Sequence, residues 1–230
     1  MGYNDTDEMP WSVTHIESFT NCPYLYANQY EWKTIKYEST PAMEAGQRAH
    51  QQLYLRLQRT PIPLPPELEP LEPMCRSFES KGTVHAELPI AITRNLTETG
   101  FYARDVWHRA KIDVALVLNG GTALAAFDWK NGNPNYEKPF QLGVYAVDLM
   151  IKFPEAQRVA VANVWLRTNQ LGEVRRFTRK DDFQRLAADV FSRHDDIVRA
   201  RKAGSWPKMP NPFCKGCKVP QCEHKQPARD

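Results

Sequence analysis

The sequence predicts a mixed α/β fold, in which helices precede an antiparallel-rich sheet that a further helix crosses. Helical patterns occur before residue 60, whereas β-branched residues and apolar–polar alternation indicate strands from about Thr83. With 230 residues, of which 42% are apolar, the chain can bury a substantial core. We therefore expect a single domain spanning residues 1–230.

Two helices are expected before the sheet. The first runs from Ser12 to about Tyr30, with Cys22 inside or beside it. The second begins after Thr40, because a threonine cap precedes Pro41 at the first helical position. This second helix carries His50 and continues through "LYLRLQ".

A proline-rich stretch follows the second helix. Residues 59–73, "RTPIPLPPELEPLEP", hold six prolines in fifteen residues. Proline is excluded from helix interiors and central strands, so we expect an extended surface connection there.

The second half of the chain alternates strands and helices. Four strands are expected, at Thr83–Thr93, Gly100–Val106, Lys111–Leu118 and Thr122–Trp129. A helix at about Tyr136–Ile151 follows them. The segments "RVAVANVWLRT" and "EVRRFTR", with a turn at Gly172, predict a hairpin, and Asp181–Ala203 reads as an amphipathic helix.

Charge and cysteine content narrow the function classes. The net charge is +3, yet the segment from Arg199 to Arg229 contains eight Lys or Arg residues and one acid, Glu223. This basic tail could bind a polyanion or simply be solvated. No run approaches the roughly 20 apolar residues of a membrane span, and "MGYNDTDEMP" shows no signal pattern, so we expect a cytoplasmic protein. Five cysteines in such a chain favour metal ligation over disulfides.

The segment "VLNGGTA", residues 117–123, predicts a tight hairpin because Asn-Gly-Gly accepts positive φ. With Gly120–Gly121 as the turn, Asp113 lies opposite Asp128. A loop shifted by one residue makes the two carboxylates diagonal neighbours on the same face. Alternation puts Lys130 on the face of Asp128. Like charges this close favour a divalent cation with oxygen ligands between them.

Asp113, then "DWK" (Asp128 to Lys130) across a hairpin, resembles the PD-(D/E)XK nuclease superfamily. Gln141 and Tyr145 lie four apart on a helix and resemble the Gln-x-x-x-Tyr element of its RecB-like branch, although the polar edge of an amphipathic helix would hold the same pair. The segment "AGQRAH", ending at His50, resembles the histidine-bearing helix of that branch. The resemblance implies a restriction-endonuclease-like fold, a mixed central sheet flanked by helices.

The resemblance also implies roles for these residues. Asp113 and Asp128 would hold Mg²⁺ or Mn²⁺ with help from His50, whose nitrogen suits manganese more than magnesium. Lys130 would position the attacking water or stabilise the charged transition state. The helical glutamine and tyrosine would orient the DNA strand or the lysine. With Glu87 of "HAELPI" as a candidate auxiliary acid, the expected catalytic set is Asp113, Asp128, Lys130, Gln141, Tyr145 and Glu87.

The remaining motif is "FCKGCKVPQCEH" near the C-terminus. It offers three of the four ligands that a thiolate site needs, and the distant Cys22 is the natural fourth. The candidate cofactor-binding residues are Cys22, Cys214, Cys217 and Cys222. Cys75 is expected to be an ordinary core residue.

One early and three late cysteines resemble the layout of iron–sulfur exonucleases in the RecB-like branch, including the AddB helicase-nuclease subunit and the CRISPR-adaptation exonucleases. The resemblance implies a [4Fe-4S] cluster that joins residues 12–30 to residues 205–224. The last spacing is one residue shorter than the usual family form, and His224 could replace a cysteine. A structural Zn²⁺ ion is therefore the alternative.

The resemblance implies a metal-dependent DNA exonuclease that acts on single-stranded DNA or DNA ends in recombination, repair or CRISPR-type adaptation. A recombination, helicase or integrase partner fits this reading, and so does an oligomer. Two alternatives stay open: a non-catalytic zinc-bearing nucleic-acid-binding module, and a nuclease subunit that is active only with a partner.

Overall fold

The computed structural model describes residues 10–35, 39–58, 62–132, 134, 137–220 and 222–225. Two compact units divide the chain. Thr40–Ala188 belongs to the first, and Trp11–Ser39 with Asp189–Asp230 makes the second. Helix α6 (Arg179–Ala203) begins in the first unit and ends in the second. None of the helices in the described ranges is long and apolar enough to span a membrane.

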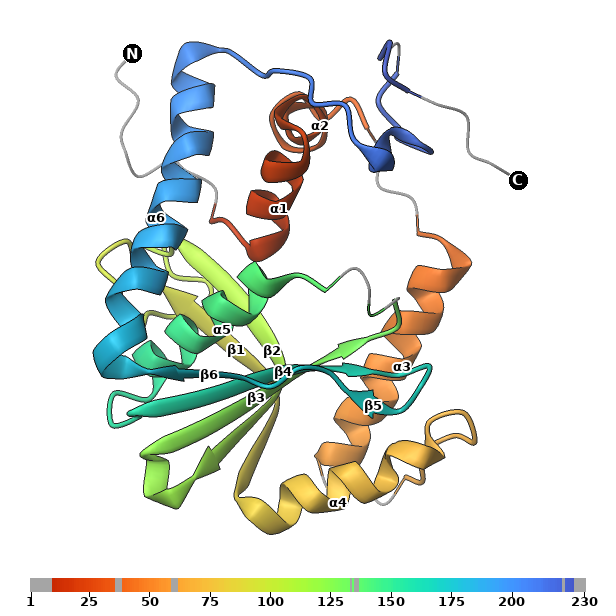
Figure 1. Ribbon diagram of the computed structural model, residues 1–230, viewed down its shortest axis with the longest axis vertical. Coiled ribbons are helices and arrows are strands. Elements are labelled where there is room, and N and C mark those ends of the chain that lie inside the picture. The colour runs from red at the N-terminus through yellow and green to blue at the C-terminus, as the bar shows by residue number, and fades with distance from the viewer. Residues whose placement is uncertain are drawn as a thin grey trace. The chain divides into compact units, whose positions relative to one another are not determined.

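A mixed sheet forms the centre of the first unit (Figure 1). Its strands in the described residues are β1 (Thr83–Ile92), β2 (His108–Leu118), β3 (Ala123–Lys130), β4 (Arg158–Trp165), β5 (Gln170–Leu171) and β6 (Arg175–Thr178). The order is β1-β2-β3-β4-β5, and β6 also pairs with β4. Only the β3–β4 pair is parallel within these ranges, and helix α5 (Pro139–Lys152) connects its two strands. The predicted mixed α/β fold is confirmed.

Helices cover both faces of this sheet (Figure 1). On one face, Leu142 and Leu149 of α5 belong to a buried cluster with sheet residues such as Ile90. On the other face, α3 (Pro41–Leu57) and α4 (Glu72–Lys81) contribute side chains such as Leu53 and Phe78 to a second cluster. The two clusters hold the sheet rigidly between helical layers, which fixes the residues at its edge.

Helix α3 forms where its capping residues predict it. The Thr40 hydroxyl accepts a hydrogen bond from the Met43 amide at 3.3 Å, and Pro41 occupies the first turn. The buried Leu53 and Leu57 direct one side of the helix to the sheet. His50, one turn before Leu53, is thereby carried toward the strand ends.

Helix α4 begins inside the stretch expected to be extended. Pro73 lies in its first turn, where a missing N–H removes no intrahelical hydrogen bond, so this proline is compatible with a helix. A short 3₁₀ turn, Glu69–Leu71, leads into the helix. Residues 62–65 lie in neither a helix nor a strand, and residues 59–61 lie outside the described part of the chain. Cys75 of α4 is fully buried, as expected of a core residue.

The predicted strand at Gly100–Val106 is wrong. The chain turns there, with the Ala103 N–H donating to Gly100 O at 2.9 Å, and an earlier turn closes with the Thr93 N–H donating to Thr97 O at 2.9 Å. Backbone groups satisfied locally do not need a neighbouring strand. Strand β2 starts after this loop, at His108.

The hairpin between β2 and β3 has the predicted register but a longer loop. Leu118 pairs with Ala123 and Val114 with Phe127, which is the register that sets Asp113 against Asp128. The loop has four residues, 119–122, rather than the expected two. Positive φ runs through Asn119, Gly120 and Gly121, at 49°, 64° and 95°.

Two other predicted elements differ at their ends. The described helix α5 starts at Pro139, and Tyr136, the expected first residue, lies outside the described residues. The late hairpin is present, with β4 antiparallel to β5 and β6, but it reverses at residues 166–169 instead of Gly172. Gly172 donates its N–H to Asn163 O at 2.8 Å, so it belongs to the edge of the sheet.

In the second unit, the expected helix at residues 12–30 is broken at Cys22. Helix α1 (Val13–Asn21) ends before this residue and α2 (Pro23–Tyr26) starts after it. Cys22 is extended, at φ −166° and ψ 108°, because the following proline disfavours helical backbone at the preceding residue. A π-helical turn, Ala27–Glu31, then ends the helical segment.

The early and late segments of the second unit contact each other directly. The rings of Tyr26 and Trp206 stack with centroids 5.7 Å apart. Arg201 forms an ion pair with Glu31 at 2.6 Å. The amide of Asn211 donates to Asn21 O at 2.9 Å, beside Cys22.

Candidate active site

The sheet opens at the end that carries the candidate residues. The paired ladder of β2 and β3 stops at Val114 and Phe127, one pair before Asp113 and Asp128. The backbone of Trp129 has no ladder partner on β2 there, and side chains take that place. Its N–H donates to Asp113 Oδ2 at 2.8 Å, and its carbonyl lies 2.9 Å from His50 Nε2.

A backbone irregularity on β1 contributes to this opening. Glu87 has a φ of +50°, in the left-handed region that non-glycine residues rarely occupy. Ala86 packs on the side of α3 and α4, whereas Leu88, two residues later, packs on the side of α5. Normal alternation would put both on one face, so the strand changes face at Glu87. Strained residues of this kind cluster at functional sites.

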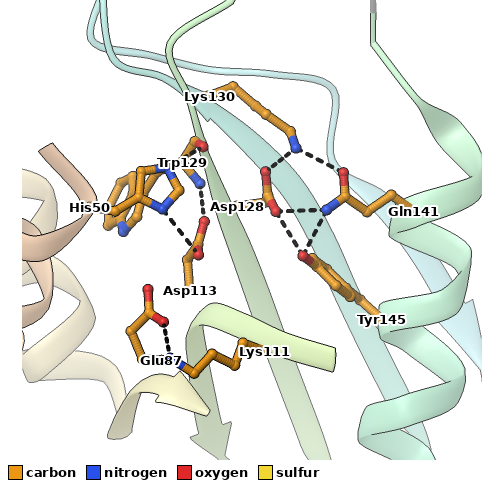
Figure 2. A network of polar contacts seen from close by, with 9 residues as sticks. All are labelled: His50, Glu87, Lys111, Asp113, Asp128, Trp129, Lys130, Gln141 and Tyr145. Carbon is orange, nitrogen blue, oxygen red and sulfur yellow. Dashed lines mark hydrogen bonds and ion pairs between the residues drawn. The ribbon is translucent and has the colours of Figure 1, made fainter. Parts of the chain in front are cut away.

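Three potential ligands from three elements meet beside this irregularity (Figure 2). Single ligand atoms of His50, Glu87 and Asp113 all lie within 4.8 Å of one another. His50 Nδ1 is 3.3 Å from Asp113 Oδ1, and Lys111 Nζ is 3.1 Å from Glu87 Oε2. An imidazole with two carboxylates is a donor set that suits Mn²⁺ and Mg²⁺. The residues present therefore fit a divalent metal ion.

A second group lies on the α5 side of the same opening (Figure 2). Tyr145 Oη donates to Asp128 Oδ1 at 2.8 Å, and Gln141 Nε2 donates to the same oxygen at 3.0 Å. Lys130 Nζ lies 2.6 Å from Asp128 Oδ2 and 2.8 Å from Gln141 Oε1. Gln141 and Tyr145, four residues apart on α5, are also joined to each other at 2.8 Å. Gln141 thus contacts both Asp128 and Lys130 of β3, and Tyr145 contacts Asp128.

Burial and charge shift the protonation of this site. Burial raises the pKa of Asp113 and the charge of Asp128 adds to the rise, although the contact with His50 opposes it. Burial lowers the pKa of His50, but contacts with Asp113 and the charge of Asp128 outweigh it and raise the pKa overall. Burial, followed by the charge of Asp128, raises the pKa of Tyr145 well above 10, so its hydroxyl stays protonated. Shifts of this origin are typical of catalytic clefts.

The structure thus brings the expected residues to one opening of the sheet, in two groups. His50 and Asp113 lie with Glu87, while Asp128 lies with Lys130, Gln141 and Tyr145. Asp128 is not a member of the compact ligand group found in the described residues. Its carboxylate is turned toward α5 instead, and the backbone of its neighbour, Trp129, contacts His50 and Asp113 of the other group.

Sequence reasoning missed a polar network beside this site. Asn163 of β4 pairs in register with Asp128 of β3, and it is 1% exposed. Its amide donates to Glu137 Oε1 at 2.9 Å, and Arg175 lies 3.3 Å from the other Glu137 oxygen. Glu137 precedes α5, so this network ties the start of that helix to β4. The signal would have been a polar residue inside the apolar run "RVAVANVW".

A buried pair below the site was also missed. His108 Nε2 lies 3.1 Å from Asp148 Oδ2, and the two residues are 2% and 1% exposed. His108 is the first residue of β2, and Asp148 lies one turn beyond Tyr145 on α5. The pair therefore links the strand of Asp113 to the helix of Tyr145.

The cysteines lie in the second unit. Those expected to bind a cofactor, together with His224, line one cavity of about 60 Å³. The four are Cys22, Cys214, Cys217 and Cys222, and none is in a disulfide. The surrounding tail is less cationic than its sequence suggests, because Arg199, Arg201 and Lys208 form ion pairs with acids.

Comparisons with known proteins bear on the fold and the family. A family model described as the PD-(D/E)XK nuclease superfamily matches residues 10–222. Among solved structures, a Eubacterium rectale protein named "Putative exonuclease" is similar at 11% identity and a TM-score of 0.55, covering 100% of this chain and 96% of that one. The protein SSO0001 is similar at 13% identity and a TM-score of 0.50, covering 96% and 89%.

At 11–13% identity the solved structures show the fold alone. The comparison with curated proteins found no match. The family model, in contrast, matches nearly the whole chain, including the hairpin of Asp113 and Asp128 and the helix of Gln141 and Tyr145. The chain belongs to the PD-(D/E)XK nuclease superfamily.

Proposed function

We propose that the protein is a divalent-metal-dependent DNA exonuclease that hydrolyses phosphodiester bonds in single strands or at DNA ends. The observation that carries the proposal is the sheet opening, where the ligand group of His50, Glu87 and Asp113 adjoins the Lys130–Asp128 pair through the Trp129 backbone. Membership of a nuclease superfamily supplies the reaction class. The name of the Eubacterium rectale neighbour and the resemblance to RecB-like enzymes favour an exonuclease.

In this proposal His50 and Asp113 would hold Mg²⁺ or Mn²⁺ with Glu87 as the auxiliary acid, and Asp128, the third expected ligand, is held next to them by Gln141, Tyr145 and Lys130. A bound ion of this kind lowers the pKa of a water ligand and neutralises charge on a phosphate oxygen. Asp113 and His50 already face each other at 3.3 Å, and Glu87 completes their compact group. Lys111, which forms an ion pair with Glu87, is more than half exposed, so this pair leaves the Glu87 carboxylate accessible.

Lys130 is the residue we expect to act on the reacting phosphate. Its ammonium is held by Asp128 and Gln141, and its side chain is 29% exposed, so it can reach a bound strand. It would position the attacking water or stabilise the negative charge that develops on the phosphate. Since Gln141 contacts both Asp128 and Lys130, and Tyr145 contacts Asp128, these contacts support orientation of the lysine rather than of the strand.

We also propose that the four cysteines hold an iron–sulfur cluster. They line one cavity in the second unit, which supports a shared ligand. The same thiolates could hold a structural zinc ion, and the resemblance to the iron–sulfur exonucleases of the RecB-like branch is what favours the cluster.

Elemental analysis of anaerobically purified protein would separate the two cofactors. We expect about four irons and four sulfides per chain, with the broad visible absorbance of such a cluster. Stoichiometric zinc without sulfide would replace the cluster by the structural zinc site. Neither readout depends on nuclease activity.

The exonuclease proposal is tested with one fluorescent single-stranded DNA, offered in linear and covalently circular form. With Mg²⁺ or Mn²⁺ we expect digestion of the linear strand alone, abolished by a chelator. Cleavage of the circle would make the enzyme an endonuclease. Failure to cut either form, with binding retained, would favour the non-catalytic module or a subunit that needs a partner.

A further inference from the structure

The first unit contains a groove of about 790 Å³ on the α3 side of the sheet. Its walls are α3, the proline-rich connection at residues 63–68, and the turn that follows β4. The volume lies in the range of ligand sites, roughly 300–1,000 Å³. A void of this size within one unit is large enough to admit a ligand rather than ordered water alone.

The groove adjoins the candidate active site through the chain itself. Asn131, one of its lining residues, follows Lys130, and Ala49 precedes His50. Leu166 also lines it, and the Leu166 N–H donates to Lys130 O at 2.9 Å. A ligand that fills the groove therefore lies next to the backbone of Lys130, the expected catalytic lysine, and of His50.

The lining of the groove matches a nucleic acid strand. Arg48 and Arg167 are both exposed, and Glu67 is the acid among the lining residues. Guanidinium groups pair with phosphate oxygens in a forked geometry. The amides of Gln52 and Asn131 add hydrogen-bonding groups.

The opposite wall is apolar. It consists of the proline rings and leucine side chains of residues 63–68, with Leu166 from the start of the turn that follows β4. Because the proline rings restrict the backbone and Leu68 N–H closes a turn onto Pro65 O at 2.8 Å, this wall presents a preformed apolar surface. Base faces can pack on such a surface without regard to sequence, while phosphates face the arginines.

We propose that this groove binds single-stranded DNA and leads the strand to the catalytic lysine. Binding of the strand is inferred from the groove alone, whereas its delivery to Lys130 rests on the proposed function. A duplex is a poorer occupant, because a wall of apolar rings contacts exposed bases and not paired ones.

The test measures binding without cleavage. Fluorescent single-stranded DNA is titrated against Lys130→Ala protein in a chelator, at several salt concentrations, with and without the added change Arg48→Ala/Arg167→Ala. Each lost phosphate contact lowers the salt slope by about 0.7 for a single strand, so we expect a drop of about 1.4 and a several-fold weaker affinity. Circular dichroism confirms that the variants are folded.

Two further variants control the result. Arg76→Ala removes an arginine of similar exposure on α4, 74% against 70% for Arg48, that does not line the groove, and it should leave the slope unchanged. Arg48→Lys/Arg167→Lys keeps the charge and should retain most of the slope. An unchanged slope in the alanine double variant, or an equal loss in Arg76→Ala, would overturn the proposal. Because no cleavage is required, an inactive enzyme would leave this test intact.

Discussion

Replacing Tyr145 with phenylalanine probes the network that holds Asp128. The change removes one oxygen from a residue that is 5% exposed and keeps the ring in the core. The hydroxyl donates to Asp128 Oδ1 at 2.8 Å and accepts from Gln141 Nε2 at 2.8 Å. Asp128 Oδ1 keeps its second donor, Gln141, at 3.0 Å, so no carboxylate oxygen is left bare.

A hydrogen bond to a charged group contributes about 1.5–3 kcal/mol. If this amount is lost from the transition state, kcat/KM falls roughly 10- to 150-fold, at about 1.36 kcal/mol per factor of ten. The lower end is expected, because Gln141 remains. The assay is single-turnover hydrolysis of a labelled oligonucleotide, with urea unfolding of the same variant to measure stability.

The comparison with Gln141→Ala makes this prediction specific. Gln141 binds Asp128, Lys130 and Tyr145 at once, so its loss should reduce kcat/KM more than the loss of the tyrosine hydroxyl. Full activity of Tyr145→Phe with a lowered free energy of unfolding would show that the hydroxyl serves the core alone. That result would refute the positioning role.

Three further changes have defined outcomes. Asp148→Ala leaves His108 buried without its carboxylate partner and should lower the free energy of unfolding by about 3 kcal/mol in urea, whereas a loss under about 1 kcal/mol would contradict a buried pair. Arg56 forms a hydrogen-bonded pair with Glu72 and thereby lowers the pKa of Glu72 to about 2, so the stability from this pair is present above pH 4.5 and lost as the pH falls toward 2. Since Glu72 is about a quarter exposed, the free energy of unfolding should fall by about 1–2 kcal/mol between these pH values. Denaturant titrations of Arg56→Met should not show this fall, and an equal fall in both proteins would count against the pair. Glu87→Gln should weaken Mn²⁺ binding by about tenfold or more in calorimetry, and unchanged affinity would remove Glu87 from the site.

Parts of the fold that depend on local rules could be predicted from the sequence. Thr40 and Pro41 marked the start of α3, and the glycine pair marked the hairpin whose register sets Asp113 against Asp128. Both are decided by neighbouring residues in the chain. The four-residue loop did not disturb the register, because it is centred on the same glycines.

Features that depend on distant contacts could not be predicted. Proline in the first turn of α4 carries the same composition signal as proline in a loop, and only packing of Phe78 and Cys75 on the sheet distinguishes the two. Gly100–Val106 is a different case, because its apolar–polar alternation predicts a strand whereas local hydrogen bonds fold it into a turn. The left-handed backbone of Glu87, which groups it with His50 and Asp113, has no sequence marker such as glycine.

The site residues could therefore be identified by type and order, but not by arrangement. Alternation along a flat hairpin predicts that Asp113 and Asp128 share a site. Instead the ladder ends before this pair, so that Asp113 accepts the Trp129 N–H while Asp128 turns to the helix of Tyr145. The end of the β2–β3 ladder at Val114 and Phe127 separates the two carboxylates into adjoining groups.

The most direct test of the account is the hydrolysis of end-labelled single-stranded DNA by wild-type protein and by Lys130→Ala, each with Mg²⁺ or Mn²⁺. Lys130 contacts Asp128 and Gln141 at the surface of the site, so its removal should spare the fold. We expect metal-dependent product from the wild type and a loss of at least about 100-fold in the variant. Equal rates for the two proteins would contradict the assignment of this opening as the catalytic centre.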